Sequence, residues 1–158
     1  MLRFRFALPA ALPAALLWAA FAQAHQFSVG NLIIGHPWSR PTASGVPIGV
    51  AYLSITNNGA HGDELIAAHT PAAARVEFHR TSPESGMARM RPSGALIVGP
   101  NATVTAAPGG LHLMLVDLKT PLVEGTSVPL VLTFRSAGDV TVQLLVERRD
   151  ETPRSANH

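Results

Sequence analysis

The sequence predicts an all-β protein with a single domain, folded as a β-sandwich or barrel. Short runs of β-forming residues recur between turn-forming residues, and helical periodicity is nearly absent. When a predicted leader of 24 residues is set aside, the remaining 134 are enough for one hydrophobic core. No segment among them looks like a linker long enough to divide the chain. We therefore expect one sandwich over residues 25–147.

Nine runs are expected to form strands, because each is rich in β-forming residues and is bounded by turn signals. In chain order they are Leu32–His36, Ile48–Thr56, Glu64–Ala68, Arg75–His79, Ala95–Val98, Thr103–Ala106, His112–Leu118, Val128–Arg135 and Val140–Glu147. The last two runs alternate clearly and flank the turn Ser136–Asp139, which predicts a C-terminal hairpin. Residues 148–158 are expected to form a flexible tail.

Residues 1–24 have the organisation of a cleavable secretory signal peptide. Arg3 and Arg5 supply positive charge, Ala7–Ala22 is apolar, and Ala22-Gln23-Ala24 is a small-residue cleavage site. The apolar stretch has about 16 residues and two prolines, which is short of the ~20 residues that a membrane span needs. We expect a mature chain without a membrane span, located in a bacterial periplasm. The absence of cysteine excludes a lipobox and fits an oxidising compartment.

Charge and composition exclude several classes of function. The net charge of +2 comes from Arg3 and Arg5, so the mature chain has ten basic and ten acidic residues. It has no basic run with interleaved aromatic residues and no glycine-rich phosphate loop, so we expect no binding to nucleic acid. No Ser-His-Asp set stands out, and the adjacent Asp63 and Glu64 would point to opposite faces of a strand. We do not expect an enzyme.

Soft or borderline metal ligands gather in one window of this cysteine-free chain: His79, Met90, His112 and Met114. Imidazole and thioether donors together suit monovalent copper, whereas magnesium and calcium prefer oxygen. A single methionine is commonly core filler and a single strand histidine is commonly solvated. Here, however, every methionine after Met1 falls in or beside the window. The neutral donors predict a site that carries Cu(I), and the lack of a thiolate excludes a blue-copper centre.

The spacing of these residues predicts how they are presented. His79 follows an apolar alternation and is expected to face outward from its strand. His112 and Met114 are two residues apart, so they project from one face, about 7 Å apart along the strand. Met90 follows the turn-forming run Thr81–Gly86, which we expect to be a loop that returns Met90 towards His79.

The order of the four residues, H-x10-M-x21-H-x-M, resembles the signature of the PCuAC family of periplasmic copper chaperones. The resemblance covers about residues 30–147 and extends through His36–Arg40, Ala51–Ile55, Asn57–Gly59, Met90–Pro92 and Pro108–Leu115. It implies a cupredoxin-like Greek-key β-sandwich with an exposed Cu(I) site made by His79, Met90, His112 and Met114. The chain has Arg80-Thr81 where many relatives have a further methionine, and it lacks the Met/His-rich tail of some relatives.

The ligand set and the resemblance together predict a periplasmic Cu(I) chaperone that delivers copper towards the CuA site of cytochrome c oxidase. The resemblance implies a CuA-bearing oxidase subunit or a Sco-type copper protein as its partner, and a role in oxidase assembly and copper homeostasis. A copper storage or scavenging protein and a β-sandwich binding module without a metal are the alternatives.

Other residues leave further interpretations open. Cleavage after Ala24 would make His25 the N-terminal residue, whose amine and imidazole could chelate Cu(II) as in a copper oxygenase. A frayed N-terminal histidine is the ordinary interpretation. The sequence leaves open whether His25 or Met87 contributes to copper binding. The remaining histidines of residues 26–149 are expected to pack, to cap or to lie at the surface: His36, His61 and His69.

Overall fold

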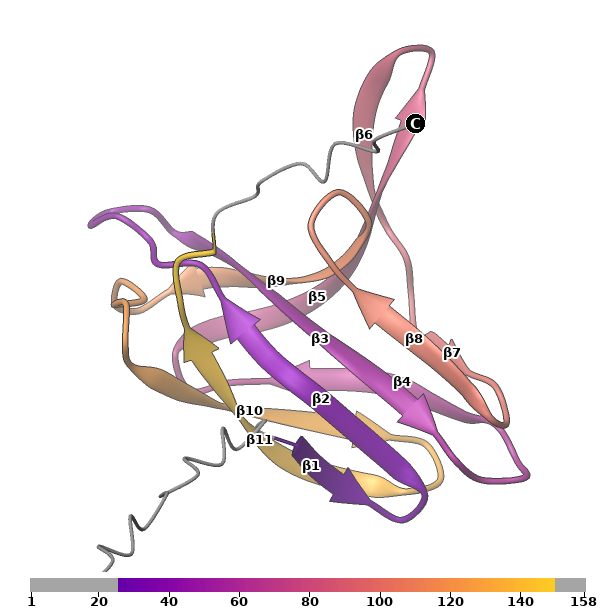
Figure 1. Cartoon of the computed structure of the whole chain (residues 1–158). Coiled ribbons are helices and arrows are strands. Elements are labelled where there is room, and N and C mark those ends of the chain that lie inside the picture. Colours follow the sequence, from indigo (N-terminus) through magenta and orange to yellow (C-terminus); the bar gives the residue numbers. More distant parts are fainter. Residues whose placement is uncertain (1–25, 150–158) are drawn as a thin grey trace, which may run out of the picture.

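The computed structural model describes residues 26–149, which form eleven strands and no helix (Figure 1). The strands are β1 (Gln26–Val29), β2 (Leu32–Ser39), β3 (Ile48–Asn57), β4 (Asp63–His69), β5 (Ala73–Glu84), β6 (Met87–Pro92), β7 (Leu96–Val98), β8 (Ala102–Ala106), β9 (Leu111–Leu118), β10 (Ser127–Phe134) and β11 (Gly138–Val146). The predicted all-β class is confirmed. No helix of residues 26–149 is long and apolar enough to cross a membrane.

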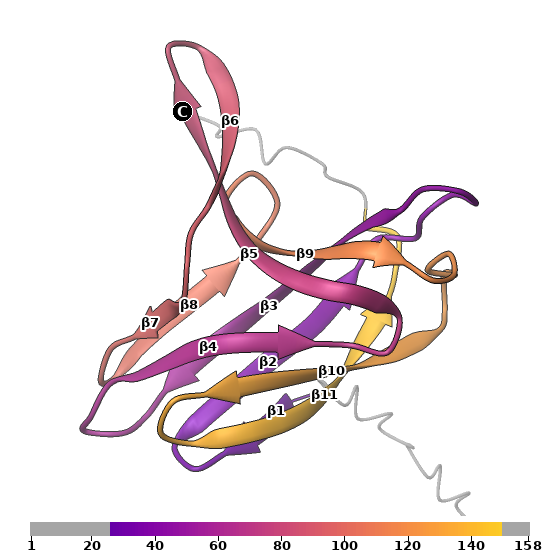
Figure 2. The same cartoon turned by 180° about the vertical axis from the view of Figure 1, so that it is seen from behind.

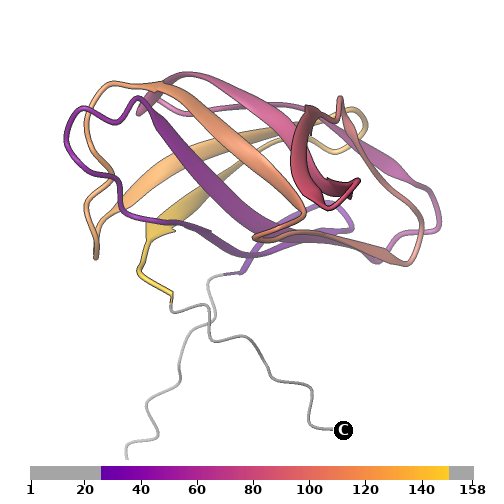
Figure 3. The same ribbon diagram turned by 90° about the horizontal axis from the view of Figure 1, so that it is seen from above.

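The strands form one sheet that curls around a single core (Figure 3). Its order is β6-β5-β9-β3-β2-β11-β10-β4-β7, with β1 paired to β2 and β8 paired to β3. Neighbouring strands are antiparallel except β11 and β2, which are parallel. The sheet does not close, so β6 and β7 remain as its two ends.

The apolar residues that alternate along the sequence form the inner face of this sheet. In β9, Leu111, Leu113 and Leu115 are at most 3% exposed and point into the core. In β10, Leu130, Leu132 and Phe134 also point into this core. Burying one such side chain stabilises the fold by roughly 1.5–3 kcal/mol. The core therefore fixes which residues of β9 face inward and which face outward.

All nine expected strands are present, and two further strands were not expected. β1 forms a short hairpin with β2 around Gly30, whose φ of 55° suits glycine. β6 arises because the run Thr81–Gly86 is not a loop: residues 81–84 continue β5, and only Ser85 and Gly86 form the turn. All residues of β6 are exposed, so no apolar alternation marks it in the sequence.

The β5–β6 hairpin projects well beyond the rest of the molecule (Figures 1 and 2). Its two turn residues have φ of 52° (Ser85) and 81° (Gly86), the backbone signs of a type I′ hairpin turn. The register pairs Thr81 with Met90 and Glu84 with Met87. Because side chains alternate along a strand, Met90 and Met87 lie on opposite faces of the hairpin.

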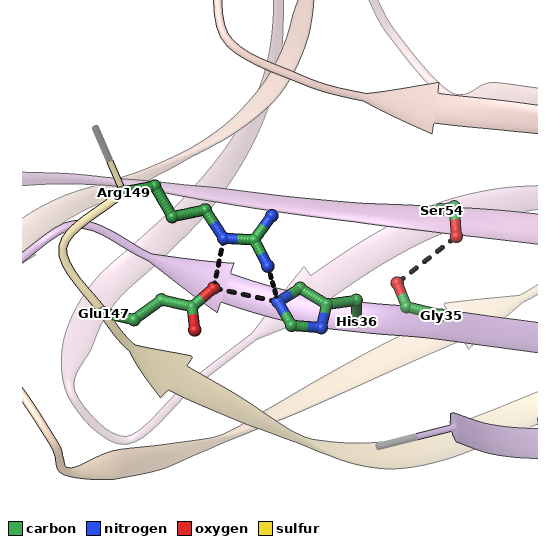
Figure 4. A network of polar contacts seen from close by, with 5 residues as sticks. All are labelled: Gly35, His36, Ser54, Glu147 and Arg149. Atoms are coloured by element: carbon green, nitrogen blue, oxygen red, sulfur yellow. Dashed lines mark hydrogen bonds and ion pairs between the residues drawn. The ribbon is translucent and has the colours of Figure 1, made fainter. Parts of the chain in front are cut away.

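Near the C-terminal end of the described chain, polar contacts attach residues 147–149 to β2 (Figure 4). Nε2 of His36 lies 2.8 Å from Oε1 of Glu147, and the guanidinium of Arg149 contacts both side chains. Arg149 also lies over the ring of Trp38, with 4.6 Å between Cζ and the ring centroid. Next to His36, a Cβ on Gly35 would meet Oγ of Ser54 at 2.6 Å, so a side chain at this position would force Ser54 to move. His36 is exposed and takes part in these polar contacts at the surface.

Asp63, the first residue of β4, joins β4 to the turn between β10 and β11. Its Oδ1 accepts hydrogen bonds from the backbone N–H groups of Glu64 and Ser136, and Oδ2 accepts one from Ala137, at 2.8–2.9 Å. Burial alone would raise the pKa of Asp63, but the bonds from Ser136, Glu64 and Ala137 outweigh it and hold the pKa below its ordinary value. The folded state therefore favours the ionised carboxylate.

We expect Asp63→Asn to lower the free energy of unfolding by ~1–2 kcal/mol at pH 7, because the amide loses one acceptor oxygen and the charge. Since the pKa of Asp63 is lower in the folded state, its contribution is present above the unfolded value near ~3.9 and is lost as pH falls through the folded value. Urea unfolding at pH 7 and at about pH 2.5 measures this difference. The exposed Asp139→Asn is the control, and an Asp63→Asn deficit of equal size at both pH values would contradict the prediction.

Candidate metal centre

Two histidines from neighbouring strands form the centre of the candidate site. The register of β5 and β9 pairs His79 directly with His112, so both side chains leave the same face of the sheet. Their rings stack with centroids 6.1 Å apart and an interplanar angle of 28°. The pair lies where β5 leaves β9 to enter the projecting hairpin (Figure 1).

Each ring uses one nitrogen in a hydrogen bond and leaves the other without one. Nδ1 of His112 lies 2.9 Å from the carbonyl oxygen of Gly110, and Nε2 of His79 lies 2.9 Å from Oε2 of Glu77. Nε2 of His112 and Nδ1 of His79 are buried and have no hydrogen-bond partner among residues 26–149. Buried polar atoms without partners are rare in folded proteins.

These contacts assign the tautomers of the neutral rings. The carbonyl of Gly110 and the carboxylate of Glu77 only accept hydrogen bonds, so the nitrogens facing them carry the protons. The unpartnered Nδ1 of His79 and Nε2 of His112 are then the atoms with free lone pairs. Two buried lone pairs on stacked rings are a suitable start for a metal site.

His79 is less exposed than its strand pattern predicts. The alternation places it on the face opposite Val76 and Phe78, as expected, but only 13% of its side chain is exposed. Its ring stacks on the ring of His112, which is itself 4% exposed. His79 therefore lies on the outward face, as the alternation predicts, and the stacked ring of His112 lies next to it there.

The thioethers share this face of the sheet. Met114 is half-buried, lies two residues from His112 and is paired with Glu77 of β5. Met90 is paired with Thr81, two residues beyond His79, and is 52% exposed on the hairpin. The four predicted ligands thus lie on one face of the β6-β5-β9 part of the sheet. Within residues 26–149, no group of three His, Cys, Asp or Glu side chains is placed to hold a metal, so a site here needs thioethers.

The sequence did not indicate the polar network behind His79. Glu77 accepts a hydrogen bond from Nε of Arg75 at 2.7 Å, and Nη1 of Arg75 donates to Oδ2 of Asp117 at 2.8 Å. The hydrogen bonds from Arg75 and then from His79 hold the pKa of Glu77 below its ordinary value. The spacing of Arg75, Glu77 and His79 shows that they share a face, but only the register with β9 brings Asp117 to them.

The other residues considered above lie away from this centre or outside the described residues. Met87 is 59% exposed and points from the hairpin face opposite Met90, so the two thioethers do not lie side by side. His61 and His69 are exposed. Glu64 forms an ion pair with Arg135, so Asp63 and Glu64 both contact the segment around the turn between β10 and β11. The predicted signal peptide, His25 and residues 150–158 lie outside the described residues.

Comparisons with known proteins agree on one group. Residues 32–146 match the family described as LpqE-like, a family of predicted lipoproteins. The predicted lipoprotein Lxx21020 of Leifsonia xyli subsp. xyli is 26% identical over 129 residues, which cover 81% of this chain and 76% of that protein. The copper-bound PCuAC domain from PmoF2 is 30% identical with a TM-score of 0.69, covering 79% of this chain and 99% of the domain. The solution structure of CuI-DR1885 from Deinococcus radiodurans is 26% identical with a TM-score of 0.61, covering 83% of this chain and 86% of that structure.

Proposed function

The chain belongs to the LpqE-like family, the family of the PCuAC domains, and on this premise we propose that it is an extracytoplasmic copper chaperone carrying one Cu(I) per chain. Its family was predicted correctly, and its fold is the cupredoxin-like β fold of these domains. We further propose His79, Met90, His112 and Met114 as the ligands. Copper is the cargo of this protein, which carries it without reacting with it.

One observation carries the proposal: two buried imidazole nitrogens with free lone pairs lie on a sheet face that also carries two thioethers. A neutral donor set of this kind leaves Cu(I) its single positive charge and suits its softness. It is a poor set for calcium or magnesium, which require oxygen ligands. That the related PmoF2 domain and DR1885 have copper-bound structures supports copper as the ligand here.

The position of the site favours a carrier over a store. The histidine pair lies near the β6 end of the sheet, Met90 is half-exposed, and His79 also lines an open groove of about 460 Å³. The ligands of an acceptor can therefore enter one at a time and displace the neutral donors. Thiolate-rich acceptors bind Cu(I) more strongly than imidazole and thioether, so transfer to them is favourable.

We propose the periplasm as the location and a CuA-bearing oxidase subunit or a Sco-type protein as the acceptor. The signal-peptide pattern of residues 1–24 and the lipoprotein names of the relatives support a location outside the cytoplasm. The soft-ligand argument supports an acceptor with thiolates.

Stopped-flow transfer of Cu(I) from the loaded protein to an apo CuA domain tests the chaperone role. We expect a rate that rises with acceptor concentration, because a ligand of the acceptor can displace the half-exposed Met90 and so attack bound copper directly. A small Cu(I) chelator at the same free-copper buffering strength is the control for simple dissociation. If release is slow, first order and independent of acceptor concentration, copper leaves by simple dissociation. The protein would then be a storage or scavenging protein and not a chaperone.

A further inference from the structure

Glu77 is linked to the candidate site by an ordered chain of contacts that no ligand assignment includes. Arg75 donates hydrogen bonds to Asp117 and to Glu77, and Glu77 accepts a further one from Nε2 of His79. The three distances are 2.7–2.9 Å. The chain joins β5 to the end of β9, so both strands of the site share it. It ends on the ring nitrogen that faces away from the unpartnered Nδ1.

We infer that Glu77 is a positioning residue that fixes His79 as the Nε2–H tautomer and so presents Nδ1 to copper. The inference rests on the proposed function and adds the orientation of one ligand. In an unconstrained histidine the proton can lie on either ring nitrogen, and a 180° ring flip would place carbon atoms where Nδ1 and Nε2 now lie. Glu77 prevents this, because only Nε2–H can donate to a carboxylate held in place by Arg75.

His112 has a different anchor, which makes the two ligands unequal. The carbonyl oxygen of Gly110 takes the proton of its Nδ1, so His112 presents Nε2. This anchor belongs to the backbone and cannot be removed by changing a side chain. Within residues 26–149, the ring of His79 is held by a hydrogen bond to a side chain, that of Glu77. The orientation of His79 is therefore the adjustable half of the pair.

Charge supports the same role. Asp117, Arg75 and Glu77 together carry one net negative charge next to the neutral imidazoles and thioethers. The single positive charge of Cu(I) brings the whole assembly to neutrality, which a divalent ion would not do. Outer carboxylates that hold a ligating histidine typically account for about a 10–100-fold change in metal affinity.

The test compares Glu77→Ala and Glu77→Gln with the unchanged protein, with Glu84→Ala as the matched control. Glu84 also pairs with arginines, Arg89 and Arg91, but it lies on the hairpin face opposite Met90. In apo protein at pH 8, ¹⁵N spectra of the imidazoles report the tautomer without any copper. Competition with a Cu(I) chelator then gives the affinity of each variant.

We expect His79 to be the Nε2–H tautomer in the unchanged protein and a mixture in Glu77→Ala, with His112 unchanged in both. Cu(I) affinity should fall about 10–100-fold in Glu77→Ala, less in Glu77→Gln, which keeps an acceptor oxygen, and not in Glu84→Ala. The inference is overturned if Glu77→Ala leaves the tautomer unchanged, or shifts it without weakening copper more than Glu84→Ala does. If the unchanged protein binds no Cu(I), the proposed function fails, while the apo spectra still decide whether Glu77 sets the tautomer.

Discussion

Replacing His112 with alanine is expected to abolish tight Cu(I) binding. His112 is only 4% exposed and supplies a buried lone pair on Nε2, which alanine cannot replace. The loss in affinity should exceed the roughly 10–100-fold cost of removing a residue that merely supports a ligand. Competition against a Cu(I) chelator measures it, and circular dichroism verifies that the sheet is retained.

The control is His61→Ala, which removes an exposed histidine in the loop between β3 and β4 and should leave the affinity unchanged. A matched pair tests the thioether half of the site on the hairpin. Met90→Leu keeps the shape but removes the sulfur and should weaken Cu(I), whereas Met87→Leu on the opposite face should not. The four-ligand proposal fails if either His112→Ala or Met90→Leu binds Cu(I) with the same affinity as the unchanged protein.

Leu113→Ala is expected to have the largest effect on stability of the changes considered. Leu113 lies between the two proposed ligands of β9, is fully buried and belongs to the central core. Truncating a buried leucine loses its burial and leaves a cavity, which costs roughly 2–5 kcal/mol. Urea unfolding should show a lower midpoint with the same dependence on urea concentration.

An exposed residue of similar size gives the control for that measurement. Ile97 is 75% exposed on β7, so Ile97→Ala should change the free energy of unfolding by no more than about 0.5 kcal/mol. If Leu113→Ala were as mild as Ile97→Ala, the inward direction of Leu113 would be wrong. The directions of His112 and Met114 would then be wrong as well, because the three residues alternate.

The sequence predicts most of this fold because burial imposes a period on it. Leu130, Leu132 and Phe134 reveal their strand through their alternation, since each must reach the core. β6 has no such constraint: all of its residues are exposed, so turn-forming residues before it suggested a loop. Its two-residue turn needs a positive φ at Ser85, and a serine at that position does not predict a positive φ.

The candidate site was predictable in its residue types but not in its supporting contacts. The spacing of His112 and Met114 along one strand indicates a shared face without any knowledge of neighbours. The pairing of His79 with His112 depends on the register of β5 against β9, which is set by distant core packing. The link from Glu77 through Arg75 to Asp117 depends on the same register, and so does the separation of Met87 from Met90.

The parallel pairing of β2 with β11 has a consequence for how the chain folds. β10, β4 and β7 connect to the rest of the sheet only through β11 in the hydrogen-bonded order, and β11 ends at Val146. Early hairpins such as β2–β3 can form locally, but the two groups of strands cannot join until nearly the whole chain is available. Such non-local closure places the protein among β folds that fold in about milliseconds to seconds. The joining of the two groups is therefore a late step that needs β11, although local hairpins can form before it.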